Sequence, residues 1–162
     1  MKIIRYIVCL CLIVSVVIIS SCTIETYSVR KSYADSEILS YVVDKEIEVR
    51  PDSTGLVFYF TQSGTGESPK NGDKAAFHYK GYFLNGEVFD SSYGKSYPLI
   101  IELGENQIVT GLEMALLKMN KGSKATVIIP FYLAYDDMEN APVPPYSNLI
   151  FELELIDFTT EK

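Results

Sequence analysis

Apolar and polar residues alternate along several stretches after residue 55, and a period of two is typical of β-strands. The alternation is clearest from Asn148 to Phe158, where leucine and phenylalanine alternate with glutamate. Similar patterns predict further strands over 98–103 and 124–130, the latter with polar or mixed residues between its apolar ones, and a two-stranded hairpin over 77–93. The continuous apolar run over 56–60 predicts a buried or nearly buried strand. The main part of the chain is therefore predicted to be a β-sheet.

The hairpin over 77–93 combines a turn signal with unusual chemistry. Asn85-Gly86 predicts a two-residue turn, because both residues tolerate a positive φ. After the turn, Phe89-Asp90 places a carboxylate beside an aromatic ring. Such an acid is costly to hold unless it is hydrogen-bonded or functional, so we expect a site here.

One short helix is predicted within the sheet region. Thr110 and Glu113 have the spacing of a capping box, and Lys121-Gly122 has the composition of a helix end. Between them, an apolar stripe at helical spacing is formed by Leu112, Ala115, Leu116 and Met119. The prediction is an α+β fold in which a single antiparallel sheet of five to six strands wraps around one short amphipathic helix.

A second helix is predicted before the sheet region, over about 33–44. Ser32 and Asp35 suggest a capping box at its start. Its apolar stripe is formed by Ile38, Leu39, Val42 and Val43. Residues 23–31 are polar and are expected to form a tether.

The N-terminal segment has the pattern of a bacterial lipoprotein signal peptide. Lys2 and Arg5 precede an apolar run over 7–19, and the following Ser20-Ser21-Cys22 resembles a lipobox. We therefore expect residues 1–21 to be a signal peptide and Cys22 to carry lipid. Simple signal cleavage and an uncleaved anchor are the alternatives.

Domain organisation follows from these segments. The signal peptide (1–21) is followed by a lipid-anchored tether with a short helix (22–54), one globular domain (55–158) and a tail (159–162). With 162 residues, of which 48% are hydrophobic, the chain is long enough for one core but not comfortably for two.

Charge and cysteine usage exclude several function classes. The formal net charge is −7, so a nucleic-acid partner is not expected. Cys9 and Cys11 lie within the apolar run, which leaves the expected mature domain without a free thiol or a disulfide. His78 is the only histidine, and we expect no metal site and no cofactor.

Several separated motifs occur in one order along the chain. They are HYKG at 78–81, VFDSS at 88–92, LG at 103–104 with IVTGL at 108–112, Pro130 with Ala134-Tyr135, Pro144-Pro145, and LIFE at 149–152. In this order the stretch 55–158 resembles the FKBP-type (macrolide-binding) peptidyl-prolyl cis-trans isomerases. The resemblance covers most of the expected mature chain.

The resemblance implies an enzyme that needs no nucleophile, metal or cofactor. An X-Pro amide rotates slowly because its partial double bond must be broken, at a barrier of about 18–20 kcal/mol. A water-poor aromatic pocket disfavours the planar, polar amide more than the twisted one, which is differential binding of the transition state. The implied substrates are proline-containing polypeptides, here exported proteins that fold at the cell envelope.

The resemblance also assigns residues to roles. Asp90 at the pocket edge, Tyr135 as a donor to the substrate carbonyl, and Phe89 are the implied catalytic residues. The implied substrate-binding residues are Tyr79, Phe89, Leu99, Ile101, Ile108, Val109, Leu112, Val143, Tyr146 and Phe151. The alternatives are an ordinary core for the apolar residues, and a turn-stabilising contact from Asp90 to Ser91 or Ser92.

Departures from the family pattern refine these expectations. Leu112 stands where many members have tryptophan, and Leu99 where an aromatic is common, so macrolide binding is expected to be weak. The loop after Tyr135 is acidic, which suggests a preference for substrates with basic residues near the proline. The alternative functions are a non-catalytic proline-binding or chaperone module, and an accessory lipoprotein of an envelope machine such as gliding motility.

Localisation follows from Cys22 and its neighbours. The expected mature protein is lipid-anchored in a bacterial envelope. Ile24 is not the aspartate that retains some lipoproteins at the inner membrane, so the outer membrane, facing the periplasm, is preferred.

Overall fold

The computed structural model describes residues 26–160. The expected signal peptide and the lipid-bearing Cys22 lie outside the described residues. The chain divides into two compact units between Tyr33 and Ala34, a point inside the first helix, which spans 26–44. Within the described part of the chain, no helix has both the length and the apolar character needed to span a membrane.

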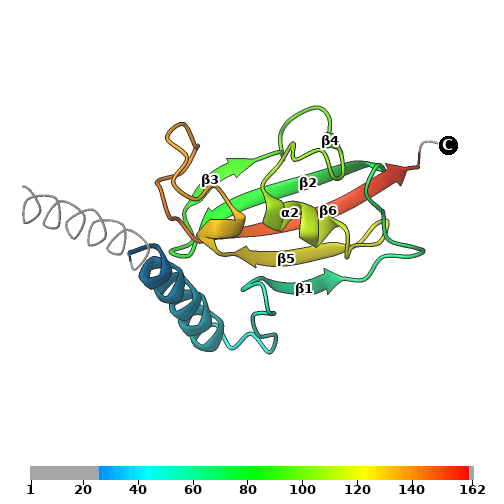
Figure 1. Ribbon diagram of the computed structural model, residues 1–162. Coiled ribbons are helices and arrows are strands. Elements are labelled where there is room, and N and C mark those ends of the chain that lie inside the picture. The colour runs from blue at the N-terminus through cyan, green and yellow to red at the C-terminus, as the bar shows by residue number, and fades with distance from the viewer. Residues whose placement is uncertain (1–25, 161–162) are drawn as a thin grey trace, which may run out of the picture. The chain divides into compact units, whose positions relative to one another are not determined.

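The second unit is built on a six-stranded antiparallel sheet (Figure 1). Five strands follow the order β1-β5-β6-β2-β3, and β4 also pairs with β2. Their bounds are Val57–Gln62 (β1), Lys74–Phe83 (β2), Val88–Ser91 (β3), Leu99–Glu102 (β4), Lys124–Ile129 (β5) and Leu149–Thr159 (β6). Helix α2 (Thr110–Leu116) and a 3-10 turn, η1 (Phe131–Leu133), complete the unit. The predicted fold class is confirmed.

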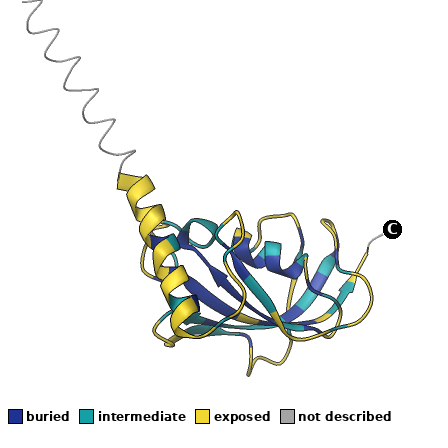
Figure 2. Cartoon of the chain, turned by 90° about the horizontal axis from the view of Figure 1, so that it is seen from below, coloured by how far each residue is buried: buried dark blue, intermediate teal, exposed yellow. Residues whose placement is uncertain are grey.

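Helix α2 covers one face of the sheet, which we call the α2 face (Figure 1). Leu112 and Leu116 of the helix belong to one buried cluster with Val127 of β5 and Phe77 of β2. Buried residues accordingly run along the central strands and α2, while the loops are mostly exposed (Figure 2). Gly111 lets α2 lie close against β5, because a Cβ at this position would collide with a methyl carbon of Ile129.

The opposite face, which we call the first-helix face, is covered by residues 34–44. Ile38 and Val42 form a second buried cluster with Val57, Ile128 and Ile150. Strand β5 is covered on both faces, so all its residues except Lys124 are buried. Thr126 and Ile128 are among them, although the predicted alternation left these positions to polar or mixed residues. Phe60 on the edge strand β1 is 44% exposed, so the predicted buried strand over 56–60 is buried only at its start.

The first helix differs from its prediction. It is already helical at residue 26, the first that the structure describes, so most of the expected tether is helical and a helix start at Ser32 was wrong. Only half of the predicted stripe is buried: Leu39 and Val43 are exposed, because the sheet contacts one narrow side of the helix. Asp35 accepts a hydrogen bond from the Tyr132 hydroxyl.

Helix α2 is shorter than predicted and starts differently. Its N-cap is Val109, no side chain caps it, and it ends at Leu116 rather than near Lys121. Glu113 does not close a capping box; its carboxylate accepts a hydrogen bond from the Gly104 N–H at 3.1 Å. The carboxylate thus stabilises the preceding loop instead of its own helix.

The hairpin turn contains three residues, Leu84 to Gly86, rather than two. The Phe83 N–H donates to the Glu87 carbonyl at 2.9 Å, and Gly86 alone has a positive φ, of 88°. This is the three-residue loop with a left-handed glycine at its end. The Asn85 side chain accepts from the Glu87 N–H instead of adopting a positive φ itself.

Candidate functional site

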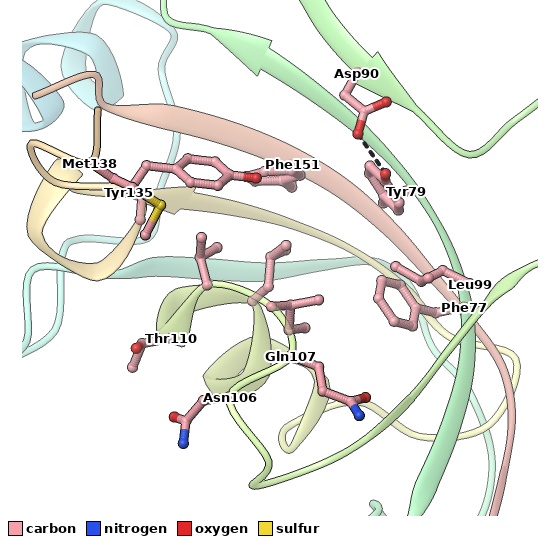
Figure 3. A pocket seen from close by; sticks show the side chains of 14 residues that line it. Phe77, Tyr79, Asp90, Leu99, Asn106, Gln107, Thr110, Tyr135, Met138 and Phe151 are labelled. Carbon is pink, nitrogen blue, oxygen red and sulfur yellow. Dashed lines mark hydrogen bonds between the residues drawn. The ribbon is translucent and has the colours of Figure 1, made fainter. Parts of the chain in front are cut away.

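A cavity of about 370 Å³ lies between α2 and the sheet (Figure 3). Tyr79 and Asp90 lie at one end, and Asn106, Gln107 and Thr110 at the other. Its lining residues are Phe77, Tyr79, Asp90, Leu99, Asn106, Gln107, Ile108, Val109, Thr110, Leu112, Ala134, Tyr135, Met138 and Phe151. The cavity exists because α2 has only seven residues and cannot cover the whole face of the sheet.

Aromatic rings from adjacent strands form one wall of the pocket. Phe77 and Tyr79 lie two residues apart on the same face of β2, and Phe151 of β6 lies with its ring centroid 6.2 Å from that of Tyr79. Phe89 packs edge-on against Phe151, with ring centroids 5.6 Å apart. Gly81 leaves room for this contact, because a Cβ there would lie 2.6 Å from the Phe89 ring.

Asp90 is held by two hydrogen bonds. The Tyr79 hydroxyl donates to Oδ2 at 2.6 Å, and the Ser91 N–H donates to Oδ1 at 2.8 Å. Burial, and then the hydrogen bond and charge of Asp90, raise the pKa of Tyr79 well above its ordinary value of 10.0. Tyr79 therefore stays neutral and continues to donate its hydrogen bond to Asp90. The Asp90 carboxylate thus binds both a pocket side chain and the backbone that follows it.

Tyr135 and Met138 approach the pocket from the loop between β5 and β6, on the side opposite Phe77 and Leu99 (Figure 3). Burial, and then the Asp90 charge, raise the pKa of Tyr135, so its hydroxyl is a neutral donor. The loop turns sharply after it at Asp136, which has a positive φ of 50°. The Asp136 carbonyl accepts from the Tyr146 N–H at 2.8 Å, which closes the loop on itself.

A family model described as FKBP-type peptidyl-prolyl cis-trans isomerase matches residues 65–156, more than half of the chain. The chain belongs to this family.

Individual relatives agree with that membership. FkpA of Escherichia coli K12, named as an FKBP-type peptidyl-prolyl cis-trans isomerase, is 38% identical over 113 residues, which are 70% of this chain and 41% of that protein. FK506-binding protein 2 of Debaryomyces hansenii is 40% identical over 88 residues, 54% of this chain and 65% of that protein. The crystal structure of Escherichia coli FkpA matches with a TM-score of 0.70 at 32% identity, covering 82% of this chain and 61% of that one. The chain thus spans about two-fifths of the length of FkpA.

Most residues expected from the FKBP-type motifs meet at one place. Eight of them line the same cavity. They are Tyr79, Asp90, Leu99, Ile108, Val109, Leu112, Tyr135 and Phe151. Because these residues come from β2, β3, β4, β6, the segment before α2, α2 itself and a loop, only the sheet topology brings them together.

Four expected residues do not line the cavity. Phe89 lies behind Phe151 and supports its ring. Ile101 and Val143 are 5% and 6% exposed and belong to the buried core. Tyr146 faces Phe131, with ring centroids 5.3 Å apart. These positions support the pocket wall and its loop.

Sequence reasoning missed other residues of this FKBP-type pocket: Phe77, Asn106, Gln107, Thr110, Ala134 and Met138. Phe77 could have been found, because it shares the strand face of Tyr79. Asn106 and Gln107 lie in a loop without periodicity, where Asn106 adopts a positive φ of 53° and Gln107 Oε1 accepts from the Glu102 N–H. Met138, 58% exposed, gives no sequence signal.

His78 lies on the other side of β2 from the pocket aromatics. Its ring stacks on Tyr93 with centroids 5.1 Å apart, and Nδ1 lies 3.1 Å from the Ser92 hydroxyl. Among residues 26–160, no three His, Cys, Asp or Glu side chains gather as a metal site would require.

Proposed function

We propose that this chain is a peptidyl-prolyl cis-trans isomerase that acts on proline-containing polypeptides. The observation that carries the proposal is the aromatic cavity of about 370 Å³ with a paired carboxylate at its edge. Membership of the FKBP-type family supports it. Such a cavity can take a proline ring out of water while the flanking peptide stays outside.

The proposed mechanism is selective binding of the twisted amide. Rotation removes amide resonance and reduces the charge on the carbonyl oxygen. An apolar pocket solvates the planar amide poorly, so it lowers the barrier for rotation without a covalent step. Tyr135, kept neutral by burial, can donate to the substrate carbonyl and hold the peptide in place.

The roles of individual residues belong to this proposal. The proline ring would contact Tyr79, Leu112 and Phe151, with Ile108 and Val109 beside it. Asp90 would act through Tyr79, because their hydrogen bond fixes the tyrosine ring in the wall. Phe89, behind Phe151, would keep the wall rigid.

An isomerisation assay with a prolyl peptide and the full chain in detergent tests the activity. We expect turnover by the unmodified protein and a fall of about tenfold in kcat/KM for Asp90→Ala, because pocket geometry is lost. Asp157→Ala is the matched control, since it removes an exposed carboxylate paired with Lys121 away from the pocket. Peptide binding without turnover by the unmodified protein would instead establish a non-catalytic proline-binding module.

We further propose that the protein is lipid-anchored through Cys22 at the bacterial envelope, on the outer membrane facing the periplasm, where it assists exported proteins. The supporting observations are Lys2 and Arg5 before the apolar run and Cys22 directly after it. Labelled fatty acid should enter the unmodified protein and not Cys22→Ser. Equal labelling of the two proteins would contradict the lipid anchor. Recovery of the labelled protein with the inner membrane would contradict the outer-membrane location.

A further inference from the structure

The loop between β5 and β6 carries part of the pocket but little regular structure of its own. Residues 130–148 include Ala134, Tyr135 and Met138, which line the cavity, and only the short turn η1. A loop of this length with little regular structure samples several conformations unless core packing and other contacts hold it. The contacts that hold it are therefore part of the site.

Asn148 fastens the base of this loop. The side chain is only 5% exposed, and its Oδ1 accepts from the N–H of Phe131, at the other end of the loop, at 3.0 Å. Its Nδ2 donates to the Ala34 carbonyl at 3.3 Å and to Glu37 Oε2 at 2.6 Å. One amide side chain thus joins both ends of the loop to the first helix.

A further hydrogen bond joins the loop to the first helix. The Tyr132 hydroxyl, on η1, donates to Asp35 Oδ1. Gly55 lies directly against this pair: its φ is 88°, and a Cβ there would collide with the Tyr132 hydroxyl. The backbone before β1 therefore needs glycine to leave space for the Asp35–Tyr132 contact. We call Asp35, Glu37, Tyr132 and Asn148 together the helix–loop contact.

On the loop side, the helix–loop contact lies close to the pocket residues in sequence. Tyr132 precedes Tyr135 by one turn, and the carbonyl of Phe131 accepts from the N–H groups of Ala134 and Asp136 at 3.0 Å. Asp35 and Glu37, by contrast, precede the residues that the family model matches. The first helix thus reaches the pocket loop through side chains outside the matched segment.

We propose that Asp35 and Glu37 of the first helix are positioning residues for the pocket, acting through Tyr132 and Asn148 on the loop that presents Tyr135. This inference rests on the proposed isomerase activity for its consequence in catalysis. The positioning of the loop itself does not depend on that activity. The two are measured separately.

Hydrogen exchange measured by mass spectrometry on the full chain in detergent tests the positioning. Tyr132→Phe removes the hydroxyl and keeps the ring, and Glu37→Ala removes the acceptor for Asn148. Amides of 131–147 should then exchange roughly tenfold faster, while those of β5 and β6 stay protected. Glu37→Gln should restore protection, because its amide oxygen can accept the same hydrogen bond.

Tyr82→Phe is the matched control. It also removes a tyrosine hydroxyl bound to a carboxylate, that of Glu152 at 2.8 Å, but away from the loop. Exchange in 131–147 that rises no more in Tyr132→Phe and Glu37→Ala than in Tyr82→Phe would overturn the inference. A uniform rise over the whole domain would also overturn it, because that is the signature of general destabilisation.

Isomerase kinetics provide the second readout. Below the melting temperature, kcat/KM should fall about tenfold in Tyr132→Phe and Glu37→Ala, and stay unchanged in Glu37→Gln and Tyr82→Phe. Altered exchange with unchanged kcat/KM would overturn a role in catalysis. If the unmodified protein shows no isomerase activity, the proposed function fails, and loop exchange alone decides the positioning role.

Discussion

On the first-helix face of the sheet, Ile38 and Val42 pack against Val57, Ile128 and Ile150. On the α2 face, the sheet meets a helix of only seven residues, and a cavity of about 370 Å³ remains beside it. The first set consists of aliphatic side chains, four of them fully buried. The cavity is lined by aromatic rings and carries a carboxylate and phenols at its edge. The same strands therefore supply a buried cluster on one face and the proposed binding site on the other.

This difference follows from the helices rather than from the sheet. The first helix packs its apolar side on the strands and leaves a cavity of about 260 Å³ beside Tyr41 and Ile128, whereas α2, with seven residues, leaves a larger one of about 370 Å³ with Asp90 at its edge. Uncovered apolar surface is costly unless a ligand takes the place of the missing side chains. The empty space on the α2 face is thus the feature that the proposed substrate would fill.

The largest expected effect comes from the first-helix face. Ile128→Ala removes a fully buried side chain and should lower the free energy of unfolding by about 2–5 kcal/mol. The kcat/KM of the folded fraction should not change, because Ile128 does not line the pocket. Urea unfolding and the isomerase assay measure the two quantities. Ile100→Ala, at a position 62% exposed, is the control and should change stability by less than about 0.5 kcal/mol.

Enlarging side chains sharpens the comparison further. Val57 is fully buried in the first-helix cluster, so Val57→Phe should cost about 1–3 kcal/mol of unfolding free energy, whereas Leu112→Phe can extend into the cavity and should cost less than about 1.5 kcal/mol. Thermal and urea unfolding of both variants give the difference. Equal costs on the two faces would mean that the cavity is not available to a larger side chain.

A smaller effect is expected from the acidic loop beside the pocket. Asp137 and Glu139 are exposed next to Met138 at the pocket rim. Prolyl peptides flanked by lysine should be turned over roughly threefold better than those flanked by glutamate at low salt. The preference should vanish at high salt, because exposed charges are screened. Equal turnover at both salt concentrations would remove this substrate preference.

The smallest effect concerns tyrosine ionisation on the two faces. Burial raises the pKa of Tyr41 beside the first-helix cluster and of Tyr79 in the pocket, but only Tyr79 has a carboxylate partner. NMR of ring-labelled tyrosine should show the pKa of Tyr79 falling toward 10.0 in Asp90→Ala and that of Tyr41 unchanged. A fall in the pKa of both tyrosines would show that the Asp90 substitution changes the fold as a whole rather than removing one hydrogen bond.

The sign of the associated stability change follows from the direction of the shift. A pKa raised in the folded state means that the folded protein binds the tyrosine proton more tightly than the unfolded chain does. The stabilisation from Tyr79 is therefore complete below pH 10.0, the ordinary value, and is lost as the pH rises through the raised pKa. Chemical unfolding at alkaline pH should show less of this loss in Asp90→Ala.

Elements with strong periodicity were predicted well from the sequence. The alternation over 148–158 corresponds to β6, and the predicted sheet around one helix is the observed fold. Motif order brought Tyr79, Asp90, Tyr135 and Phe151 into one predicted site, and all four line the cavity. These predictions succeeded because they depend on local spacing and on a family pattern.

Predictions that depend on long-range contacts were less successful. Two capping boxes were wrong, since Asp35 binds Tyr132 and Glu113 binds the loop at Gly104. A carboxylate near a helix start can cap that helix or bind another segment, and only packing decides between them. The same holds for Asn148, whose buried hydrogen bonds reach residues more than a hundred positions away.

The sequence by itself determined the strand pattern, the aromatic and acidic residues of the pocket, and the family to which the chain belongs. Tertiary structure alone decided how much of the sheet α2 leaves uncovered, which side of the first helix is buried, and which segments hold the pocket loop. The physical reason is that backbone periodicity and turn chemistry act over a few residues. Cavities and buried hydrogen bonds arise only where distant segments meet.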